Sequence, residues 1–242
     1  ILAYFMNTRQ KKCFKVNEET VHFLECIDGV KRLIEIKEIM SKKYNVVPEY
    51  VDNVLDEMVN ARIITKVNSN YNMLSEDEIH RYSRQINYFA EFLESEEKGI
   101  EAQRKIMNSA VIIFGIGAVG GNIAIELAMA GVGKIILYDF DTVEVSDACR
   151  HMYFKEEYIN ENKTVALKNE LEKINQKIKV QIIQESMKPE TNIENLIKSV
   201  DFVVNTMDEP YIGYTASKIS RVCVKHKIAH YIAGGFDAHL AS

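Results

Sequence analysis

The segment AVIIFGIGAVGGNIAIELAMAGVGKIILYDFDTVEVSDACR, residues 110–150, decides the fold. An apolar run at 111–114 is too short for a helix and rich in β-branched residues, which is typical of a buried parallel strand. The pattern then predicts a helix over 119–130 and a second β-branched strand over 135–138. The segment therefore predicts one βαβ unit.

The turn between the first strand and the helix carries three glycines in G-x-G-x-x-G spacing, Gly115, Gly117 and Gly120. Glycines let the backbone approach a phosphate closely, and the helix N-terminus offers free N–H groups and the positive end of a dipole. Asp139, at the end of the second strand, is placed to accept hydrogen bonds from a ribose. This fingerprint predicts a nucleotide without specifying which one.

Strands and helices continue to alternate after residue 150. The predicted helices cover 162–174, 192–198 and 212–226, and the predicted strands cover 179–184, 201–205 and 228–232. Strands separated by helices of this length predict a Rossmann-like, doubly wound and mainly parallel sheet, which is an α/β fold. Ligands of such sheets bind at the carboxyl ends of the strands.

The composition limits the function classes. The chain has 242 residues and a net charge of −5, which argues against nonspecific nucleic-acid binding. No apolar run approaches the roughly 18 residues that span a membrane. The cysteines lie far apart without a C-x-x-C pair, which fits a reducing cytoplasm and predicts no zinc site within these residues. We expect a cytoplasmic protein without membrane or nucleic-acid partners.

Residues 1–72 form a separate predicted domain. The pattern predicts a strand at 12–16, three helices, and a strand at 62–67, a small winged-helix-like α+β arrangement. The helices cover 18–28, 33–44 and the residues from Pro48 onward. The polar side of the third helix is acidic, which disfavours DNA as its ligand and favours a peptide or a protein.

Residues 73–109 are predicted to be a helical linker to the nucleotide-binding domain, residues 110–242. Apolar residues recur at helical spacing in the linker, and its helix carries R-Y-S-R-Q at 81–85. Judged from the helix alone, Arg84 belongs to a solvated face. The acidic residues at 94–97 are interpreted as a solvated part of the linker.

Three charged residues follow the predicted strands near their carboxyl ends: Arg150, Lys163 and Asp208. Two cations over a glycine loop offset the charge that builds at the α-phosphate of ATP, and a carboxylate holds Mg²⁺. A hydride-transferring NAD enzyme has no need for this set. An ordinary surface role is the alternative for each residue, and their shared location favours a function.

Five motifs recur together at defined spacing. They are R-Y-S-R-Q at 81–85, G-I-G-A-V-G-G at 115–121, D-F-D-T-V-E-V-S-x-x-x-R at 139–150, N-K at 162–163 and T-M-D at 206–208. In this combination the chain resembles the ThiF/MoeB/MccB superfamily of ubiquitin-activating-enzyme-like adenylyltransferases. The resemblance covers residues 75–242, and the joint spacing is more specific than any single motif.

The resemblance implies an ATP- and Mg²⁺-dependent enzyme that adenylates the C-terminal carboxylate of a small protein or peptide and releases pyrophosphate. The nucleotide-binding residues it implies are Gly115, Gly117, Gly120, Asp139 and Asp141. Within this set, Asp139 would bind the ribose.

The resemblance also implies four catalytic residues. Arg150 and Lys163 would contact the phosphates, and Asp208 would hold the magnesium ion. Arg84 would reach across a homodimer to the partner's ATP, which assigns it to the site instead of the surface.

The first domain narrows the substrate. The segment F-L-E-C-I-D-G at 23–29, followed by two helices and a strand, is similar to the peptide-clamp or leader-recognition domains of enzymes that modify ribosomally made peptides. MccB-like enzymes share this arrangement. Such a domain binds a leader peptide, often by adding a strand to the edge of its sheet. We therefore expect the maturation of a peptide natural product from its precursor.

The chain departs from the family at two places. The family usually has Ser-Asn-Leu-x-Arg-Gln where this chain has S-D-A-C-R-H at 146–151. Asp147 adds negative charge near a triphosphate, so it recruits metal, points away, or marks a weakened use of ATP. The zinc-binding C-x-x-C pairs and the acceptor-cysteine region of the family would lie beyond residue 242. The C-terminal part is thus expected to be absent, and zinc is expected only there.

Three alternatives stay open. A non-catalytic ThiF-like scaffold would bind a leader peptide and deliver the precursor to a partner enzyme. Asp147 and the missing C-terminal part favour this alternative. The four retained catalytic residues oppose it. A sulfur-carrier-protein adenylyltransferase would act on a small carrier protein. An NAD-dependent oxidoreductase is favoured only by the glycine loop with an acidic residue about 20 positions further on.

Overall fold

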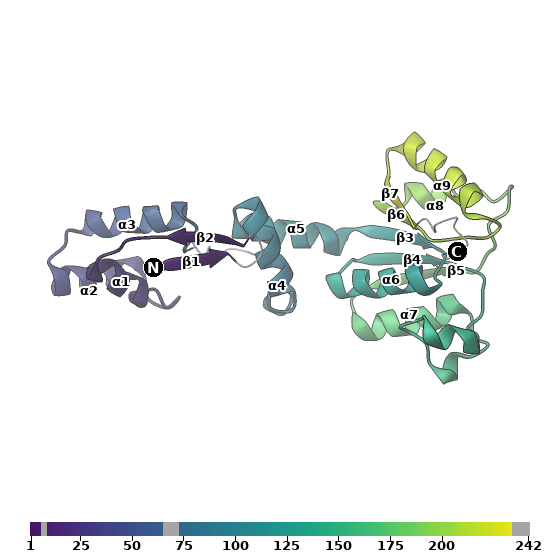
Figure 1. Ribbon diagram of the computed structural model, residues 1–242, viewed down its shortest axis with the longest axis horizontal. Coiled ribbons are helices and arrows are strands. Elements are labelled where there is room, and N and C mark those ends of the chain that lie inside the picture. Colours follow the sequence, from purple (N-terminus) through teal and green to yellow (C-terminus); the bar gives the residue numbers. More distant parts are fainter. Residues whose placement is uncertain (6–8, 65–72, 234–242) are drawn as a thin grey trace. The chain divides into compact units, whose positions relative to one another are not determined.

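The protein is described by a computed structural model that covers residues 1–5, 9–64 and 73–233 (Figure 1). The chain forms two compact units. The first comprises Ile1–Asn72 with Asn87–Gly99, and the second comprises Met73–Ile86 with Ile100–Ser242. The residues of the predicted linker are thus divided between the two units.

The second unit is built on a five-stranded sheet in which every strand is parallel to its neighbours. The strands are β3 (Ala110–Phe114), β4 (Lys134–Tyr138), β5 (Lys179–Ile183), β6 (Phe202–Asn205) and β7 (Ala229–Ile232). Their order, β5-β4-β3-β6-β7, reverses direction between β3 and β6. The prediction of a Rossmann-like, doubly wound sheet is confirmed, and ligands of such sheets bind at this reversal point.

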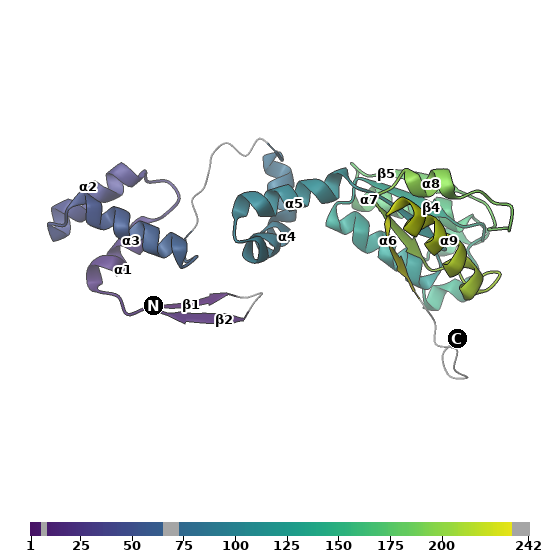
Figure 2. The same cartoon turned by 90° about the horizontal axis from the view of Figure 1, so that it is seen from above.

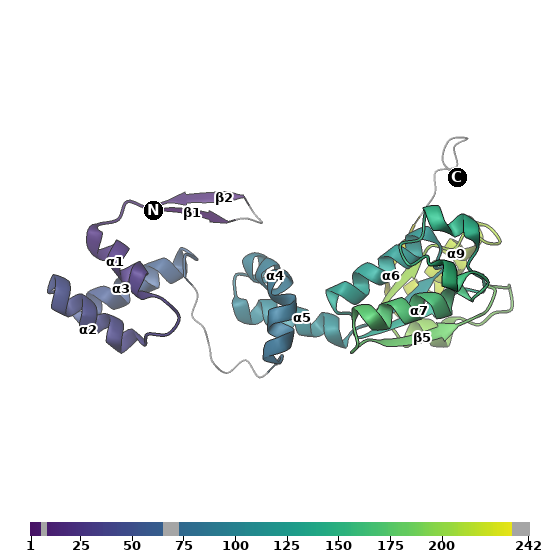
Figure 3. The same ribbon diagram turned by 90° about the horizontal axis from the view of Figure 1, so that it is seen from below.

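Helices cover both faces of the sheet because its central strands are apolar on both sides. Helices α6 (Ala118–Ala130) and α7 (Lys163–Ile174) lie side by side on one face (Figure 3). Helices α8 (Glu194–Lys198) and α9 (Ile212–His226) cover the other face (Figure 1). The side chains of Ile112, Ile113 and Phe114 are completely buried between these layers.

The carboxyl ends of the three central strands meet at one edge of the sheet. Phe114, the last residue of β3, is in register with Tyr138 of β4 on one side and Asn205 of β6 on the other. The hydrogen bonding between the strands continues for one more residue. Gly115 N–H donates to the Tyr138 carbonyl, and Thr206 N–H donates to the Phe114 carbonyl. The loops that follow the three strands therefore start next to one another.

In its described residues before position 65, the first unit contains an antiparallel hairpin and the helices α1 to α3 (Figure 2). Strands β1 (Leu2–Phe5) and β2 (Gln10–Cys13) precede α1 (Glu18–Cys26), α2 (Leu33–Tyr44) and α3 (Pro48–Asn60). The helices enclose a small core of their own. Its buried residues are Phe23, Cys26, Ile36, Met40, Val51, Val54 and Met58.

Two predicted strands of this unit differ from the structure. The strand predicted at 12–16 is β2, which runs from Gln10 to Cys13; its last residue is in register with Leu2 of β1, and Phe14 N–H donates to the Ile1 carbonyl just beyond it. The strand predicted at 62–67 is not formed over 62–64. Arg62 has a φ of +60° and its N–H donates to the Val59 carbonyl, which makes it part of the turn that ends α3. Residues 65–67 lie outside the described residues.

Helices α4 (Glu76–Leu93) and α5 (Glu96–Asn108) contribute residues to both units. The acidic residues at 94–97, interpreted as a solvated part of the linker, lie in the turn after α4 and at the start of α5, where Glu94 and Glu97 are exposed and Glu96 is partly buried. The core-facing side of α5 is hard to find by hydrophobic periodicity, because one fully buried position holds Gln103. No helix in the described part of the chain is both long and apolar enough to cross a membrane.

Candidate nucleotide site

The loops at the carboxyl edge of the sheet enclose a cavity of about 450 Å³. It lies where the strand order reverses, between the loops that follow β3, β4 and β6. The predicted site residues that line it are Gly115, Gly117, Asp139, Asp141, Arg150, Lys163 and Asp208. Gly120 and Arg84 lie elsewhere. The tertiary structure thus brings seven of the nine predicted residues to one cavity.

The glycine loop requires glycine at two positions for different reasons. Gly115 leaves β3 with a φ of +80°, a conformation that strains residues with a side chain. Gly120 lies in the first turn of α6, and a Cβ there would come within 2.0 Å of the Gly115 carbonyl oxygen. Gly120 therefore does not line the cavity; it lets the helix approach the loop closely enough to form it.

Two side chains hold the glycine loop from outside. The Thr206 hydroxyl, just after β6, donates to the Gly115 carbonyl over 2.6 Å. The buried Tyr153 hydroxyl donates to the Ile116 carbonyl over 2.8 Å. With its carbonyls held in this way, the loop directs the N-terminus of α6 toward the cavity, where free N–H groups favour an anion.

Asp139 shapes the same loop. Its Oδ2 accepts from Ile116 N–H over 2.7 Å, and its Oδ1 accepts from Asp141 N–H over 2.9 Å. The side chain is mostly buried, yet it lines the cavity, and each carboxylate oxygen has a second lone pair. Asp139 can therefore fix the loop and still accept a hydrogen bond from a ligand, and its role toward a ribose stays a prediction.

The two cations at the cavity are each held by a carboxylate. Lys163, the first residue of α7, donates to Asp141 Oδ2 over 3.1 Å, although its own side chain is almost fully buried. Arg150 Nη2 donates to Asp147 Oδ1 over 2.8 Å, and half of the Arg150 side chain is exposed. Asp147 also lies 3.8 Å from the Lys163 ammonium group. One buried carboxylate thus connects both cations.

Asp147 is not among the residues that line the cavity. Its side chain is buried, and Oδ2 accepts from Glu144 N–H at the start of a short 3₁₀ helix, η1 (Val145–Cys149). Burial favours the neutral acid, but the hydrogen bonds from Glu144 and Arg150 outweigh it and hold the pKa of Asp147 below its usual value. Asp147 is therefore a buried anion beneath the two cations that line the cavity.

Asp208 lines the cavity from the loop after β6. It is exposed, and Glu209 follows it directly. Among the described residues, no group of three or more potential metal ligands comes together. This donor set fits Mg²⁺, which is often bound by one or two carboxylates while substrate phosphates and water complete its shell. It does not fit a zinc ion held by protein ligands alone.

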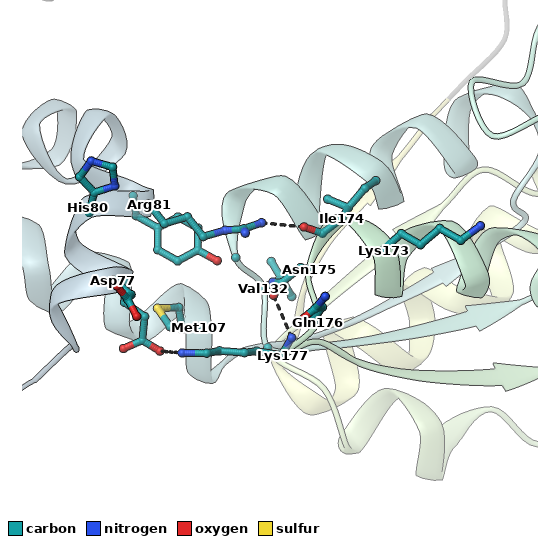
Figure 4. Close-up of a pocket in the computed structure, with 14 residues that line it drawn as sticks. Asp77, His80, Arg81, Met107, Val132, Lys173, Ile174, Asn175, Gln176 and Lys177 are labelled. Carbon is teal, nitrogen blue, oxygen red and sulfur yellow. Dashed lines mark hydrogen bonds and ion pairs between the residues drawn. The ribbon is translucent and has the colours of Figure 1, made fainter.

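The R-Y-S-R-Q motif attaches α4 to the opposite, amino edge of the sheet. Arg81 donates to the Ile174 carbonyl at the end of α7 over 2.8 Å (Figure 4). Tyr82 packs against Gly131, where a Cβ would come within 2.7 Å of the ring. Gln85 donates to the Ala130 carbonyl at the end of α6. These residues satisfy the last carbonyls of two helices and fix the rotation of α4.

Arg84 has no such role. It is exposed on α4, and within the described residues it takes part in no hydrogen bond or ion pair. It also does not line the cavity of its own chain. A cation that the helix leaves unpaired is available to a second molecule, which agrees with the implied reach across a dimer but does not test it.

Comparison with protein families identifies the chain. The family model described as the ThiF family matches residues 82–240, a segment that contains every loop of the cavity. The chain belongs to the ThiF family. The resemblance to the ThiF/MoeB/MccB superfamily is thereby confirmed, whereas the predicted peptide-clamp role of the first domain stays a prediction.

Curated ThiF-like relatives match the same part of the chain. It is 35% identical over 141 residues to the adenylyltransferase and sulfurtransferase MOCS3 of Dictyostelium discoideum, covering 58% of this chain and 31% of that protein. It is 31% identical over 171 residues to the vegetative HesA protein of Trichormus variabilis, covering 70% of this chain and 60% of that protein. The chain thus spans about a third of MOCS3 and somewhat over half of HesA.

Solved structures share the fold over almost the whole chain. The crystal structure of PaaA superimposes with a TM-score of 0.77 at 23% identity, covering 96% of this chain and 68% of that chain. The crystal structure of Escherichia coli MccB with ATP gives a TM-score of 0.68 at 24% identity, covering 90% and 60%. At this identity the likeness shows the fold, including a counterpart of the first unit.

Sequence reasoning missed several residues of this ThiF-family cavity. They are Ala118, Val119, Phe140, Thr206, Met207 and Glu209. Phe140 stands between two predicted aspartates and is partly exposed. The aromatic residue of the motif D-F-D was thus the signal in the sequence for an aromatic wall of the cavity. Thr206 belongs to the motif T-M-D, in which a role was predicted only for Asp208. The hydrogen bond of Thr206 to the glycine loop joins segments 91 residues apart, which no local pattern reveals.

Proposed function

We propose that this chain binds ATP in the cavity and transfers its adenylyl group to the C-terminal carboxylate of a peptide or small protein. The observation that carries the proposal is the convergence of the glycine loop, Arg150, Lys163 and Asp208 on one cavity at the strand-order reversal. Membership of the ThiF family and the adenylyltransferase names of its relatives support ATP over NAD.

The proposed reaction is a displacement at the α-phosphorus. An oxygen of the substrate carboxylate forms the new bond, the bond to the oxygen that bridges to the β-phosphate breaks, and pyrophosphate leaves with the electron pair. The products are an acyl-adenylate and pyrophosphate, and no net proton transfer is needed. Negative charge grows on the departing pyrophosphate and the α-phosphate, so the residues of the site serve to offset it.

Each part of the cavity has a place in this scheme. The N–H groups at the start of α6 face the phosphates, while Arg150 and Lys163 offset the charge that develops on them. Asp208, with Glu209 beside it, would hold Mg²⁺, whose charge would neutralise phosphate oxygens and fix their orientation. Phe140 offers an apolar surface for a nucleobase, and Asp139 retains a lone pair for a ribose hydroxyl.

The first unit supports a peptide as the acceptor. A groove of about 500 Å³ runs between the segment that leaves β2 and helix α3. Its apolar part is formed by Phe14, Val16, Val54 and Met58, with Tyr50 beside them. The β1–β2 hairpin is a two-stranded sheet, so an extended peptide can pair with a strand edge and place side chains in the groove. We propose that the leader of a ribosomally made precursor binds there.

Two other functions are favoured by particular observations. The MOCS3 relatives are named adenylyltransferase and sulfurtransferase, which favours a small sulfur-carrier protein as the acceptor. The pairing of Lys163 with Asp141 and of Arg150 with Asp147 reduces the positive charge offered to a triphosphate. That pairing favours a non-catalytic scaffold that delivers a leader peptide to a partner enzyme.

One assay separates these functions. The protein is incubated with ATP, Mg²⁺ and either a precursor peptide or a sulfur-carrier protein, and pyrophosphate release and the mass of the adenylate are followed. Adenylation of the peptide alone supports the proposal, and adenylation of the carrier alone selects the second function. A folded protein that binds leader peptide and adenylates neither acceptor contradicts the enzymatic proposal and selects the scaffold.

Arg84 tests the proposed homodimer. Arg84→Ala is expected to abolish adenylation without lowering the unfolding temperature, since within the described residues its side chain makes no hydrogen bond or ion pair. Mixing it with an inactive Lys163→Ala variant is expected to restore part of the activity, because one of the two sites then receives both intact residues. Arg81→Ala is the matched control, since loss of its bond to Ile174 lowers stability instead. Absence of recovery in verified mixed dimers would contradict a shared site.

A further inference from the structure

A buried histidine lies behind the cations of the cavity. His151 follows Arg150 directly, and its side chain is 0% exposed. Among the described residues, neither ring nitrogen has a hydrogen-bond partner. An unpaired polar group in a protein interior is unfavourable and calls for an explanation beyond packing. The ring stacks on Tyr153, the residue that holds the glycine loop, with centroids 5.0 Å apart.

The carboxylate of Asp147 lies close to this ring. His151 Nε2 lies 3.5 Å from Asp147 Oδ1, the same oxygen that accepts from Arg150. These two residues occupy the positions where the resembling family usually has Asn and Gln. These two departures from the pattern are thus in contact with each other, and together they replace two neutral amides by an acid and a base.

The charge balance around His151 depends on what the cations face. The charged and titratable groups around the ring are Asp147 on η1, Arg150 after η1, Lys163 on α7, Asp139 after β4 and Tyr153 in the following loop. Burial lowers the pKa of His151, and although Asp147 opposes this, Lys163 and Arg150 lower it further. The imidazole is therefore neutral near pH 7.

A polyanion in the cavity reverses this balance. Arg150 and Lys163 both line the cavity, so phosphate groups there offset the positive charge that disfavours an imidazolium ion. Phosphates also compete with Asp147 for the Arg150 guanidinium. Asp147 is buried and has to keep a counter-charge, and a protonated His151 can supply one from 3.5 Å away.

We propose that Asp147 and His151 form a positioning pair in which His151 takes up a proton from solvent when ATP engages Arg150 and Lys163. The proton binds the free ring nitrogen, and the imidazolium then neutralises Asp147 as Arg150 turns toward the phosphates. This inference rests on the proposed function, because it takes ATP as the polyanion. It makes ATP affinity depend on pH: binding that consumes a proton weakens as pH rises.

The test is calorimetry of ATP binding with Mg²⁺ and without an acceptor. Titrations in two buffers of different ionisation enthalpy at one pH give the number of protons taken up per ATP. Wild type is compared with His151→Gln and Asp147→Asn, which restore the residues usual in the family. Changes in the protonation of ATP itself are common to all three proteins and cancel in the comparison.

The wild type is expected to take up more protons per ATP than either variant, and its affinity is expected to fall more steeply with rising pH. The double variant is expected to match the single ones, because the two residues act as a unit. Equal proton uptake in wild type and in both folded variants would overturn the inference and leave the proposed function intact. A wild type that does not bind ATP would overturn both.

Discussion

Lys163→Ala is expected to lower ATP-dependent adenylation by about 10²-fold to 10³-fold, the range observed when one preorganised donor to developing charge is removed. Lys163 is suited to this role because its ammonium group reaches the cavity from the first residue of α7. It is nearly buried, so water screens its charge less than that of a surface lysine. Steady-state pyrophosphate release with a saturating acceptor measures the effect.

Lys168→Ala is the matched control on the same helix. Lys168 pairs with Glu172 on the exposed side of α7 at 3.7 Å, and surface pairs of this kind contribute little to stability. We expect the control to keep wild-type activity. The unfolding temperatures of both variants show whether loss of the Lys163–Asp141 pair disturbs the fold. A Lys163→Ala enzyme with undiminished activity would remove this residue from the proposed site.

Gly120→Ala is expected to destabilise the second unit and to abolish ATP binding. The new methyl group would meet the Gly115 carbonyl oxygen at 2.0 Å and the Thr206 hydroxyl oxygen at 2.5 Å. One of these atoms is backbone, so the glycine loop or α6 has to move. Overpacking of this kind costs about 1–3 kcal/mol, and a backbone clash falls at the upper end. Thermal unfolding followed by circular dichroism measures the loss.

Gly117→Ala provides the comparison within the same loop. A Cβ at Gly117 meets nothing within 4 Å, and its φ of −62° is open to any residue. We expect this variant to fold with nearly wild-type stability. Any change in its ATP affinity then reports on how closely the phosphates approach the backbone. If both alanine variants were equally stable, the packing of α6 against the loop would not be the reason for glycine at position 120.

Sequence motifs indicated some of the residues that line the cavity and missed others. Gly115, Asp139 and Lys163 each sit at the end of a regular element, and the periodicity of that element predicts where the end falls. Their proximity follows from strand order, which right-handed βαβ connections restrict to few choices. The strand order expected from the sequence therefore already places these positions at one edge of the sheet.

Two features of the structure run against the hydrophobic pattern. Within the helical linker predicted over 73–109, hydrophobic periodicity does not mark Gln103 as a core residue, although its side chain is fully buried and its amide donates to the Ala130 carbonyl. The strand expected from Arg62 is a turn because that residue adopts a positive φ. In the first instance a hydrogen bond to a distant residue overrides the hydrophobic pattern. In the second, the local backbone conformation does so.

The amino-acid sequence by itself determined the α/β class, the parallel doubly wound sheet, the glycine loop and the membership of the ThiF family, because periodicity and motif spacing are local properties of the chain. Only the tertiary structure decided that Asp147 is buried beneath Arg150 and Lys163, and that the ring of His151, without a hydrogen bond to any described residue, lies 3.5 Å from it. Whether a charge faces a ligand or the interior depends on which distant atoms surround it, and that information appears only when η1, α7 and β4 are packed together.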